Sequence, residues 1–363
     1  MGSGISDNYN NIVPTFTARY WKVHSAIKKS TGEEVSLWLL DSKEIKQASS
    51  SKISYQKYID SCIESVNKLR RLHHPNILQI YEVSENPKQF GFSSERVEGT
   101  LESDKTLDAD DITYVADQLS QVLSFVHEAG KLLHLGLSLD AVCITKAIKV
   151  KLCSFNYATL LESAEVKPSY GDFIEDDALS PEICYTAPEY LENKTVSTAS
   201  DVFSYGTVLF AAYNKKGPIY VATTTEEVVV TVSASAFKTP TNMNDPMHEL
   251  LLKCVSYNPE ERPTLADIAK SPAFFQLSIR SLRFLSLLAT KELDDRLHFF
   301  ENIVKSLSLF SDRLLFYNIL PTFVNEVKTN DIYGPVLIPV IFHIGSKLET
   351  DDFMSEVIDP LSS

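Results

Sequence analysis

The chain has 363 residues and a formal net charge of −14, with 48 acidic against 34 basic residues. Because nucleic-acid binding depends on lysine and arginine that neutralise phosphates, this acid excess argues against a generic nucleic-acid partner. Only 12 residues are glycine, which disfavours a function that needs a glycine-rich cradle for phosphate groups.

Cysteine content and hydropathy favour a cytoplasmic protein. The five cysteines are odd in number and form no Cys-x-x-Cys pair, so the sequence predicts neither a disulfide framework nor a zinc site. No apolar run approaches the roughly 18 residues that a membrane-spanning helix needs, and no secretory signal opens the chain. We therefore expect a chain of the reducing cytoplasm.

The N-terminus matches a lipidation template. The first six residues fit M-G-x-x-x-[ST], so Gly2 is a candidate for N-myristoylation, although a Gly-Ser-Gly start is also typical of a cloning remnant. One acyl chain gives only marginal membrane affinity, so a second signal is needed. Lysines of the first hundred residues could supply it through peripheral contact with an anionic membrane. These are Lys28, Lys29, Lys43, Lys46, Lys52 and Lys57.

The first hundred residues are expected to be rich in strands, with one prominent helix. Apolar runs predict strands over 35–40, 77–83 and 90–93. An apolar stripe at helical spacing predicts a helix over 56–72.

After residue 100 the pattern becomes mainly helical. Apolar stripes predict helices over 110–126, 201–213 and 247–254, and two short apolar runs predict strands at 142–144 and 150–152. Beyond about residue 273, large apolar residues recur at spacings of three and four, which is typical of paired helices in helical repeats. About three or more repeats are normally needed to bury such faces. Roughly two fit here, so we expect the N-terminal part of a longer protein.

Four motifs, in order along the chain, resemble those of protein kinases. Residues 72–77 (L-H-H-P-N-I) resemble the family's L-x-H-P-N-I, and residues 187–189 match its A-P-E signature. Residues 201–206 (D-V-F-S-Y-G) resemble its D-V-W-S-x-G helix start, and residues 258–264 (N-P-E-E-R-P-T) its N-P-x-x-R-P-T turn.

This resemblance implies an α+β fold, in which a two-lobed kinase-like domain is followed by α-helical HEAT-type repeats. We expect an N-terminal tail over 1–11, the N-lobe over 12–98 and the C-lobe over 99–275. The start of the repeats is expected over 276–363. Fold alone does not establish activity, so the site is considered residue by residue.

The nucleotide-binding positions of the N-lobe are all altered. The template G-x-G-x-x-G-x-V, anchored on Val23, places Phe16, Ala18 and Trp21 at the glycine positions. V-A-I-K falls on residues 35–38, so Trp38 stands where the phosphate-binding lysine belongs.

The glutamate that should pair with that lysine is also missing. Counting back ten residues from Pro75 places Ser65 at its position. Glu64 is adjacent, but one residue on a helix is a rotation of about 100°, so its side chain should point elsewhere.

In the C-lobe, the residues at the catalytic and metal-binding positions are replaced, whereas three residues at structural positions are retained. The resemblance places Gly136 at the catalytic aspartate, Ala141 at the metal-binding asparagine and Ser154 at the metal-binding aspartate. It also implies that three retained residues are structural. They are Glu189 and Arg262, which would form a buried ion pair, and Asp201, which would hold the backbone of the catalytic loop.

The sequence therefore predicts a catalytically inactive domain that binds no ATP, metal or other cofactor. Without metal ligands the charge of a γ-phosphate is neither neutralised nor positioned, and that electrostatic effect dominates phosphoryl transfer. We expect Trp38, with Phe16 or Trp21, to fill the former nucleotide cleft.

Within the kinase-like proteins, the chain resembles the Scy-like (N-terminal kinase-like) pseudokinases, and most of all their coated-vesicle-associated kinase branch. The similar segments are residues 21–23 (W-K-V), 28–30 (K-K-S), 34–35 (E-V), 187–190 (A-P-E-Y) and 274–275 (F-F). The resemblance implies a cytoplasmic scaffold in clathrin- or coat-dependent traffic between Golgi, endosomes and plasma membrane. Its partners would be clathrin or vesicle-coat proteins. Some members keep part of the nucleotide machinery, and this chain keeps less.

Two other functions are left open by the sequence. One is an atypical kinase that uses relocated residues such as Glu64, Asp41 or Lys151. The other is a pseudokinase that regulates an active kinase allosterically.

Overall fold

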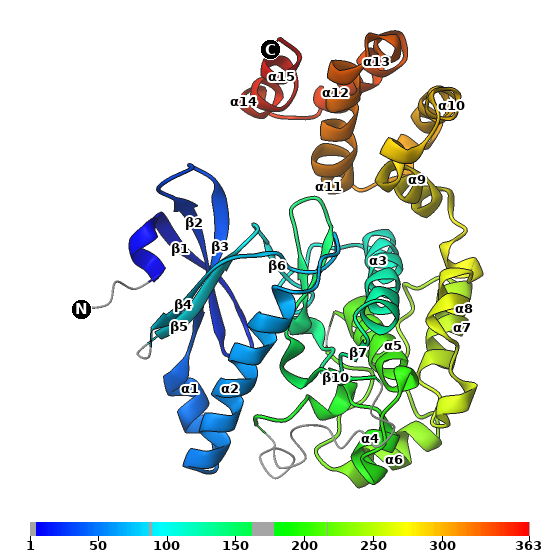
Figure 1. The fold of residues 1–363 in the computed structure, drawn as a ribbon. Coiled ribbons are helices and arrows are strands. Elements are labelled where there is room, and N and C mark those ends of the chain that lie inside the picture. The colour runs from blue at the N-terminus through cyan, green and yellow to red at the C-terminus, as the bar shows by residue number, and fades with distance from the viewer. Residues whose placement is uncertain (1–4, 87–88, 162–177, 216, 363) are drawn as a thin grey trace.

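The structure is a computed structural model that describes residues 5–86, 89–161, 178–215 and 217–362. It consists of a sheet-containing N-lobe, a helical C-lobe and a further helical segment beside the C-lobe (Figure 1). The expected fold class, a kinase fold followed by paired helices, is confirmed.

The N-lobe is built on a five-stranded antiparallel sheet in the order β1-β2-β3-β5-β4. Two helices, α1 (Ser42–Ala48) and α2 (Lys52–Leu69), follow β3. The strands are β1 (Tyr9–Ala18), β2 (Trp21–Lys28), β3 (Glu34–Leu40), β4 (Ile80–Asn86) and β5 (Gln89–Ser94).

The two faces of this sheet enter different cores, because successive strand residues point to opposite sides. On the outer face, Leu37 packs with Ile5 and Tyr9 in a small separate cluster. On the inner face, Trp38 and Phe92 join the main core, which continues into the C-lobe. The inner face is therefore the one turned toward the expected nucleotide site.

Several predicted boundaries differ from the structure, and two of them have a clear physical reason. The strand expected from residue 77 begins at Ile80, because the preceding residues pair with the C-lobe instead. Leu78 N donates to Leu152 O at 3.1 Å, and Leu152 N donates to Asn76 O at 2.8 Å. The helix expected over 56–72 begins earlier, at Lys52, because Ser51 caps it by accepting a hydrogen bond from Ser54 N.

The C-lobe is assembled around α3 (Ala109–Glu128) and the buried α5 (Thr198–Asn214). Asp108 and Asp111 form a capping box that starts α3. The other helices are α4 (Pro188–Asn193), α6 (Thr225–Ser233), α7 (Asp245–Cys254) and α8 (Leu265–Ala269). The short strands are β6 (Gly99–Thr100), β7 (Leu132–Leu133), β8 (Val142–Ile144), β9 (Val150–Leu152) and β10 (Thr159–Leu160).

The helical segment consists of short helices packed in pairs, with aromatic rings between them. Phe300 contacts the rings of Phe323 and Tyr333, at centroid distances of 5.6 and 5.1 Å. The helices are α9 (Leu277–Ser286), α10 (Leu293–Ile303), α11 (Asp312–Leu314), α12 (Leu320–Thr329), α13 (Gly334–Gly345), α14 (Thr350–Phe353) and α15 (Asp359–Ser362).

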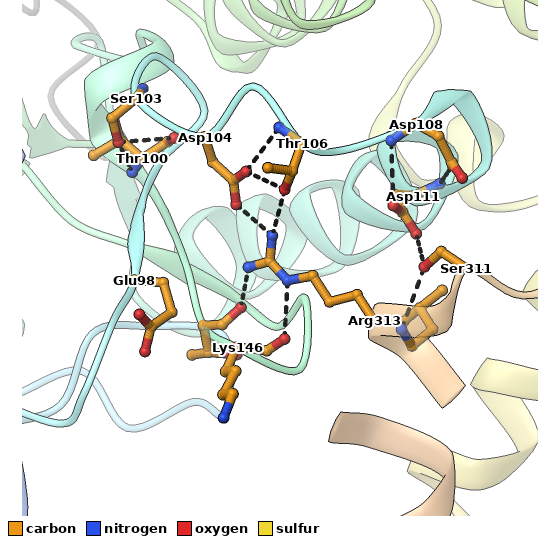
Figure 2. Close-up of polar contacts among 12 residues, drawn as sticks. Glu98, Thr100, Ser103, Asp104, Thr106, Asp108, Asp111, Lys146, Ser311 and Arg313 are labelled. Carbon is orange, nitrogen blue, oxygen red and sulfur yellow. Dashed lines mark hydrogen bonds and ion pairs between the residues drawn. The ribbon is translucent and has the colours of Figure 1, made fainter. Parts of the chain in front are cut away.

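Polar contacts fasten this segment to the C-lobe (Figure 2). Arg313 Nη1 donates to Asp104 Oδ2 at 2.6 Å, and Arg313 Nη2 donates to Thr145 O at 2.8 Å. Nearby, Ser311 Oγ donates to Asp111 Oδ1 at 2.7 Å. Within the described part of the chain, no helix combines the length and apolar character needed to cross a membrane.

Candidate functional site

The altered kinase positions lie where the inner face of the N-lobe sheet meets the loops that follow β7 and β9. We call this region, formed by β1–β3 with residues 134–141 and 153–157, the interlobe site. It is the place at which the resemblance puts a nucleotide, and its two sides are described in turn.

Trp38 fills the N-lobe side of the interlobe site. Its indole stacks on Phe92 at a centroid distance of 5.3 Å and an angle of 12°, and meets Phe16 and Trp21 edge-on. Its Nε1 donates to Ser94 Oγ at 2.9 Å, and the side chain is only 2% exposed. Trp38 thus contacts both Phe16 and Trp21, the rings with which it is expected to fill the former nucleotide cleft.

The turn between β1 and β2 carries side chains where a phosphate-binding turn carries glycine. Ala18 and Trp21 are buried and Phe16 is half-buried. Trp21 packs on Phe90 and Phe92 at centroid distances of 5.9 and 5.0 Å. Each of these positions therefore carries a side chain where close approach of the backbone to a phosphate needs glycine.

The backbone that links the two lobes is already hydrogen-bonded by Ser36, a contact that the motif comparison missed. Val97 N donates to Ser36 Oγ at 3.0 Å, and Ser36 Oγ donates to Val97 O at 3.3 Å. Both residues are fully buried. Ser36 thus engages both backbone hydrogen-bonding groups of Val97. The only signal in the sequence is a serine at the second position of V-A-I-K.

On the C-lobe side, the ring of Tyr157 occupies the space beside Gly136. A Cβ atom at Gly136 would lie 3.3 Å from Tyr157 Cγ and Cε2, and closer still to Cδ2. Tyr157 is held there because its hydroxyl donates to Leu179 O at 2.6 Å. An aspartate at residue 136 would need Tyr157 to move, and no motif revealed this.

The two expected metal positions carry no carboxylate or amide. Ala141 is buried, and its carbonyl accepts a hydrogen bond from Cys153 N at 2.9 Å. Ser154 has φ of 62°, and its hydroxyl lies 3.5 Å from Cys153 Sγ. Across the described residues, no group of three or more His, Cys, Asp or Glu side chains is placed to hold a metal ion.

The glutamate position in α2 is buried and uncharged. Ser65 is 4% exposed. The neighbouring Glu64 has a side chain that is 64% exposed and pairs with Lys68 at 3.1 Å. As the helical rotation predicts, Glu64 does not replace the missing glutamate.

The other residues considered for a relocated active site have partners of their own. Asp41 caps α1 and pairs with Lys22 at 2.5 Å. Lys151 Nζ lies 2.7 Å from Glu95 Oε2 and donates to Pro75 O at 2.6 Å.

The residues expected to contact a membrane do not form one described surface. Gly2 lies outside the described residues. Lys28 and Lys29 lie at one end of β3, near the turn between β2 and β3, whereas the other four lysines lie on α1 and α2, which follow the opposite end. A seven-residue strand spans about 20 Å, so the lysines form two groups. Lys28 also pairs with Glu82 at 2.8 Å.

Comparison with known proteins agrees with this architecture. A family model described as the protein kinase domain matches residues 19–274, well over half of the chain. The chain belongs to the protein kinase domain family. The match thus runs from the turn between β1 and β2 to the start of the helical segment.

Curated relatives extend the similarity into the helical segment. The chain is 27% identical to protein kinase domain-containing protein ppk32 of Schizosaccharomyces pombe, over 93% of this chain and 49% of that protein. It is 24% identical to SCY1-like protein 2 of Homo sapiens, over 94% of this chain and 40% of that protein. It is 25% identical to protein kinase-like protein SCY1 of Saccharomyces cerevisiae, over 99% and 51%. The resemblance to Scy-like proteins is thus confirmed, and the chain spans about half of these relatives or less.

The kinase scaffold residues bond as a structural role requires. Arg262 Nη1 and Nη2 donate to the two carboxylate oxygens of Glu189, both at 2.8 Å, and the Arg262 side chain is fully buried. Asp201 accepts hydrogen bonds from the backbone N–H groups of His134 and Leu135, at 2.7 and 2.8 Å. Burial would raise the pKa of Asp201, but the hydrogen bond and charge of His127 lower it below its ordinary value.

His134, in the loop after β7, is expected to make the fold sensitive to acid. Burial lowers the pKa of His134, although Asp201 and the bond to Cys153 O favour the charged form. In the unfolded chain this imidazole takes up a proton near pH 6.5, whereas in the folded chain it does so only at a lower pH. The free energy of unfolding therefore falls as the pH falls below about 6.5.

We expect the free energy of unfolding to fall with acid by up to about 1.4 kcal/mol per pH unit for this imidazole. Urea unfolding between pH 7.5 and 5 measures the slope. His134→Gln keeps a donor for Cys153 O and should flatten the curve; an unchanged slope would assign the sensitivity to other groups, such as His74, whose pKa burial also lowers.

A single Cβ at residue 136 tests how tightly the ring of Tyr157 packs against Gly136. Gly136→Ala should lower the free energy of unfolding by about 1–3 kcal/mol, the usual cost of overpacking, as measured by urea unfolding. Gly334→Ala is the matched control, because its Cβ would only reach ordinary contact with Ile338 at 3.6 Å. Equal stabilities for the two variants would contradict the described position of the tyrosine ring.

Proposed function

We propose that the chain is a catalytically inactive, protein-kinase-like scaffold that serves coat-dependent membrane traffic from the cytoplasm. The observation that carries its inactivity is the position of Tyr157, whose ring takes the space beside Gly136. A kinase needs an aspartate there to accept the proton of the substrate hydroxyl. Here both the carboxylate and the room for it are missing.

The nucleotide side supports the same conclusion. Trp38 replaces the phosphate-binding cation with a neutral ring that is stacked and hydrogen-bonded in place. Ala141 and Ser154 offer magnesium neither an amide nor a carboxylate. Since catalysis of phosphoryl transfer is mainly positioning and charge stabilisation, losing these groups together removes its main sources.

The scaffold role in traffic is supported by the resemblance to Scy-like proteins. The similarity to SCY1-like protein 2 and to SCY1 runs through the kinase domain and into the helical segment. That segment is fastened to the C-lobe by Arg313 and Ser311, so the two parts present one continuous surface to partners. Clathrin or vesicle-coat proteins are the partners that we propose for this surface.

Proximity labelling of the full-length protein in cells tests this function. The labelled set is expected to be enriched in coat proteins at Golgi, endosomal or coated-vesicle membranes, relative to the labelling enzyme alone. A set dominated by an active kinase and its substrates, without coat proteins, would instead favour allosteric regulation of a kinase. Gly2→Ala, run in parallel, should reduce the membrane share of the labelling if lipidation supplies the anchor.

A further inference from the structure

The tip of the turn between β1 and β2 reaches across to the C-lobe. Arg19 N donates to Asp140 Oδ2 at 3.1 Å, and Arg19 Nη1 donates to Tyr157 Oη at 2.7 Å. Arg19 Nη2 donates to Ala178 O at 3.1 Å and also to Ser180 O. One N-lobe residue thus bonds three separate C-lobe segments, namely the catalytic loop, the residues after β9 and the segment before α4.

Neighbouring aromatic side chains strengthen this bridge. Tyr20 Oη donates to Ala178 O at 2.8 Å. The Arg19 guanidinium carbon lies 5.7, 5.8 and 5.6 Å from the ring centroids of Tyr20, Tyr58 and Tyr157. These distances fall within the range of cation–π attraction. Because Tyr58 belongs to α2 and Tyr157 to the C-lobe, the cation lies between rings of both lobes.

The backbone and the surrounding charges show that the tip is held in place. Arg19 has φ of 52°, in the left-handed region that costs energy for a residue with a side chain and persists where surrounding contacts enforce it. Asp140 is half-buried, which raises the pKa of its carboxyl group, and the positive charge of Arg19 opposes that rise. Arg19 thus compensates the half-buried Asp140, to which its own backbone N–H is bonded.

We propose that Arg19 and Tyr20, with Asp140, Tyr157, Ala178 and Ser180, form an interlobe lock that holds the two lobes closed on each other. A nucleotide-binding turn must be able to lift to admit its ligand. In this chain, side chains of the same turn are hydrogen-bonded to the C-lobe, so the turn is fixed against it. The lock depends on these contacts and is independent of the proposed role in traffic.

Hydrogen–deuterium exchange of the 363-residue chain tests the lock on both of its sides. Arg19→Ala should speed exchange by about tenfold or more in peptides covering residues 15–25 and, at the same time, residues 178–187. Slow exchange in α3 should be retained, which shows that the fold is intact. Arg71→Ala is the matched control, because Arg71 is an exposed arginine of the same lobe outside the lock.

Two conservative variants test the interlobe lock even if Arg19→Ala does not fold. Tyr20→Phe keeps the ring and removes the bond to Ala178 O, so it should speed exchange in the same two regions by a smaller factor. Arg19→Lys keeps the charge but loses the forked geometry, so it should fall between the wild type and Arg19→Ala. Faster exchange confined to residues 15–25, or an equal effect of Arg71→Ala, would overturn the lock.

Discussion

Replacing Arg262 with methionine is expected to lower the free energy of unfolding by about 3–5 kcal/mol, because it leaves the largely buried carboxylate of Glu189 without its cation. The Arg262 guanidinium also donates to Ala199 O and Tyr257 O, at 2.9 and 3.1 Å, so its loss frees backbone acceptors too. Urea unfolding followed by circular dichroism measures the change.

The matched control is Arg96→Met, which breaks the more exposed pair with Glu98. Pairs of that kind contribute about 0–1 kcal/mol. The double variant Arg262→Met with Glu189→Met should recover part of the lost stability, since no buried charge is then left unpaired. A cost for Arg262→Met no larger than that of Arg96→Met would show that the Glu189–Arg262 pair does not hold the C-lobe together.

Trp38→Ala is expected to cost about 3–5 kcal/mol, the usual range for truncating a buried aromatic side chain to alanine. The change removes the stacking on Phe92, the edge contacts with Phe16 and Trp21, and the bond to Ser94 Oγ. Urea unfolding measures the loss.

Trp38→Phe separates packing from polarity at this position. A phenyl ring can keep the stacking on Phe92 but cannot donate to Ser94 Oγ, so this variant should lose clearly less stability than Trp38→Ala. If Trp38→Ala cost under about 1 kcal/mol, the indole would not be filling the interlobe site, and the space beneath the turn between β1 and β2 would be open.

Ordered motifs and apolar periodicity were enough to predict the kinase fold and its longer helices, but not β1, β2 or the short helices of the C-lobe. Residues 35–40 lie in β3, and the strands expected at 142–144 and 150–152 coincide with β8 and β9. The strand expected from residue 77 was misplaced because pairing with Leu152, 75 positions away, decides where β4 begins. Local pattern carries no information about such a partner.

The same limit applies to the candidate site. Motif spacing locates Gly136 and Trp38, but it cannot show what takes the place of the missing groups. Tyr157 lies beside Gly136 only once the loops after β7 and β9 are folded together. Arg19 meets Tyr157 across 138 residues of sequence. An arginine in a turn gives no sign by itself that it will bridge two lobes.

The most direct test of the central claim, that the interlobe site admits no nucleotide, is a thermal-shift titration of the 363-residue chain with ATP and Mg²⁺ or Mn²⁺. An active kinase domain in the same buffer serves as the positive control. A ligand at 100 times its Kd stabilises the folded state by about 2.7 kcal/mol, so binding in the accessible range would be visible. We predict no saturable shift with either metal ion; a saturable, metal-dependent rise in Tm would contradict the claim.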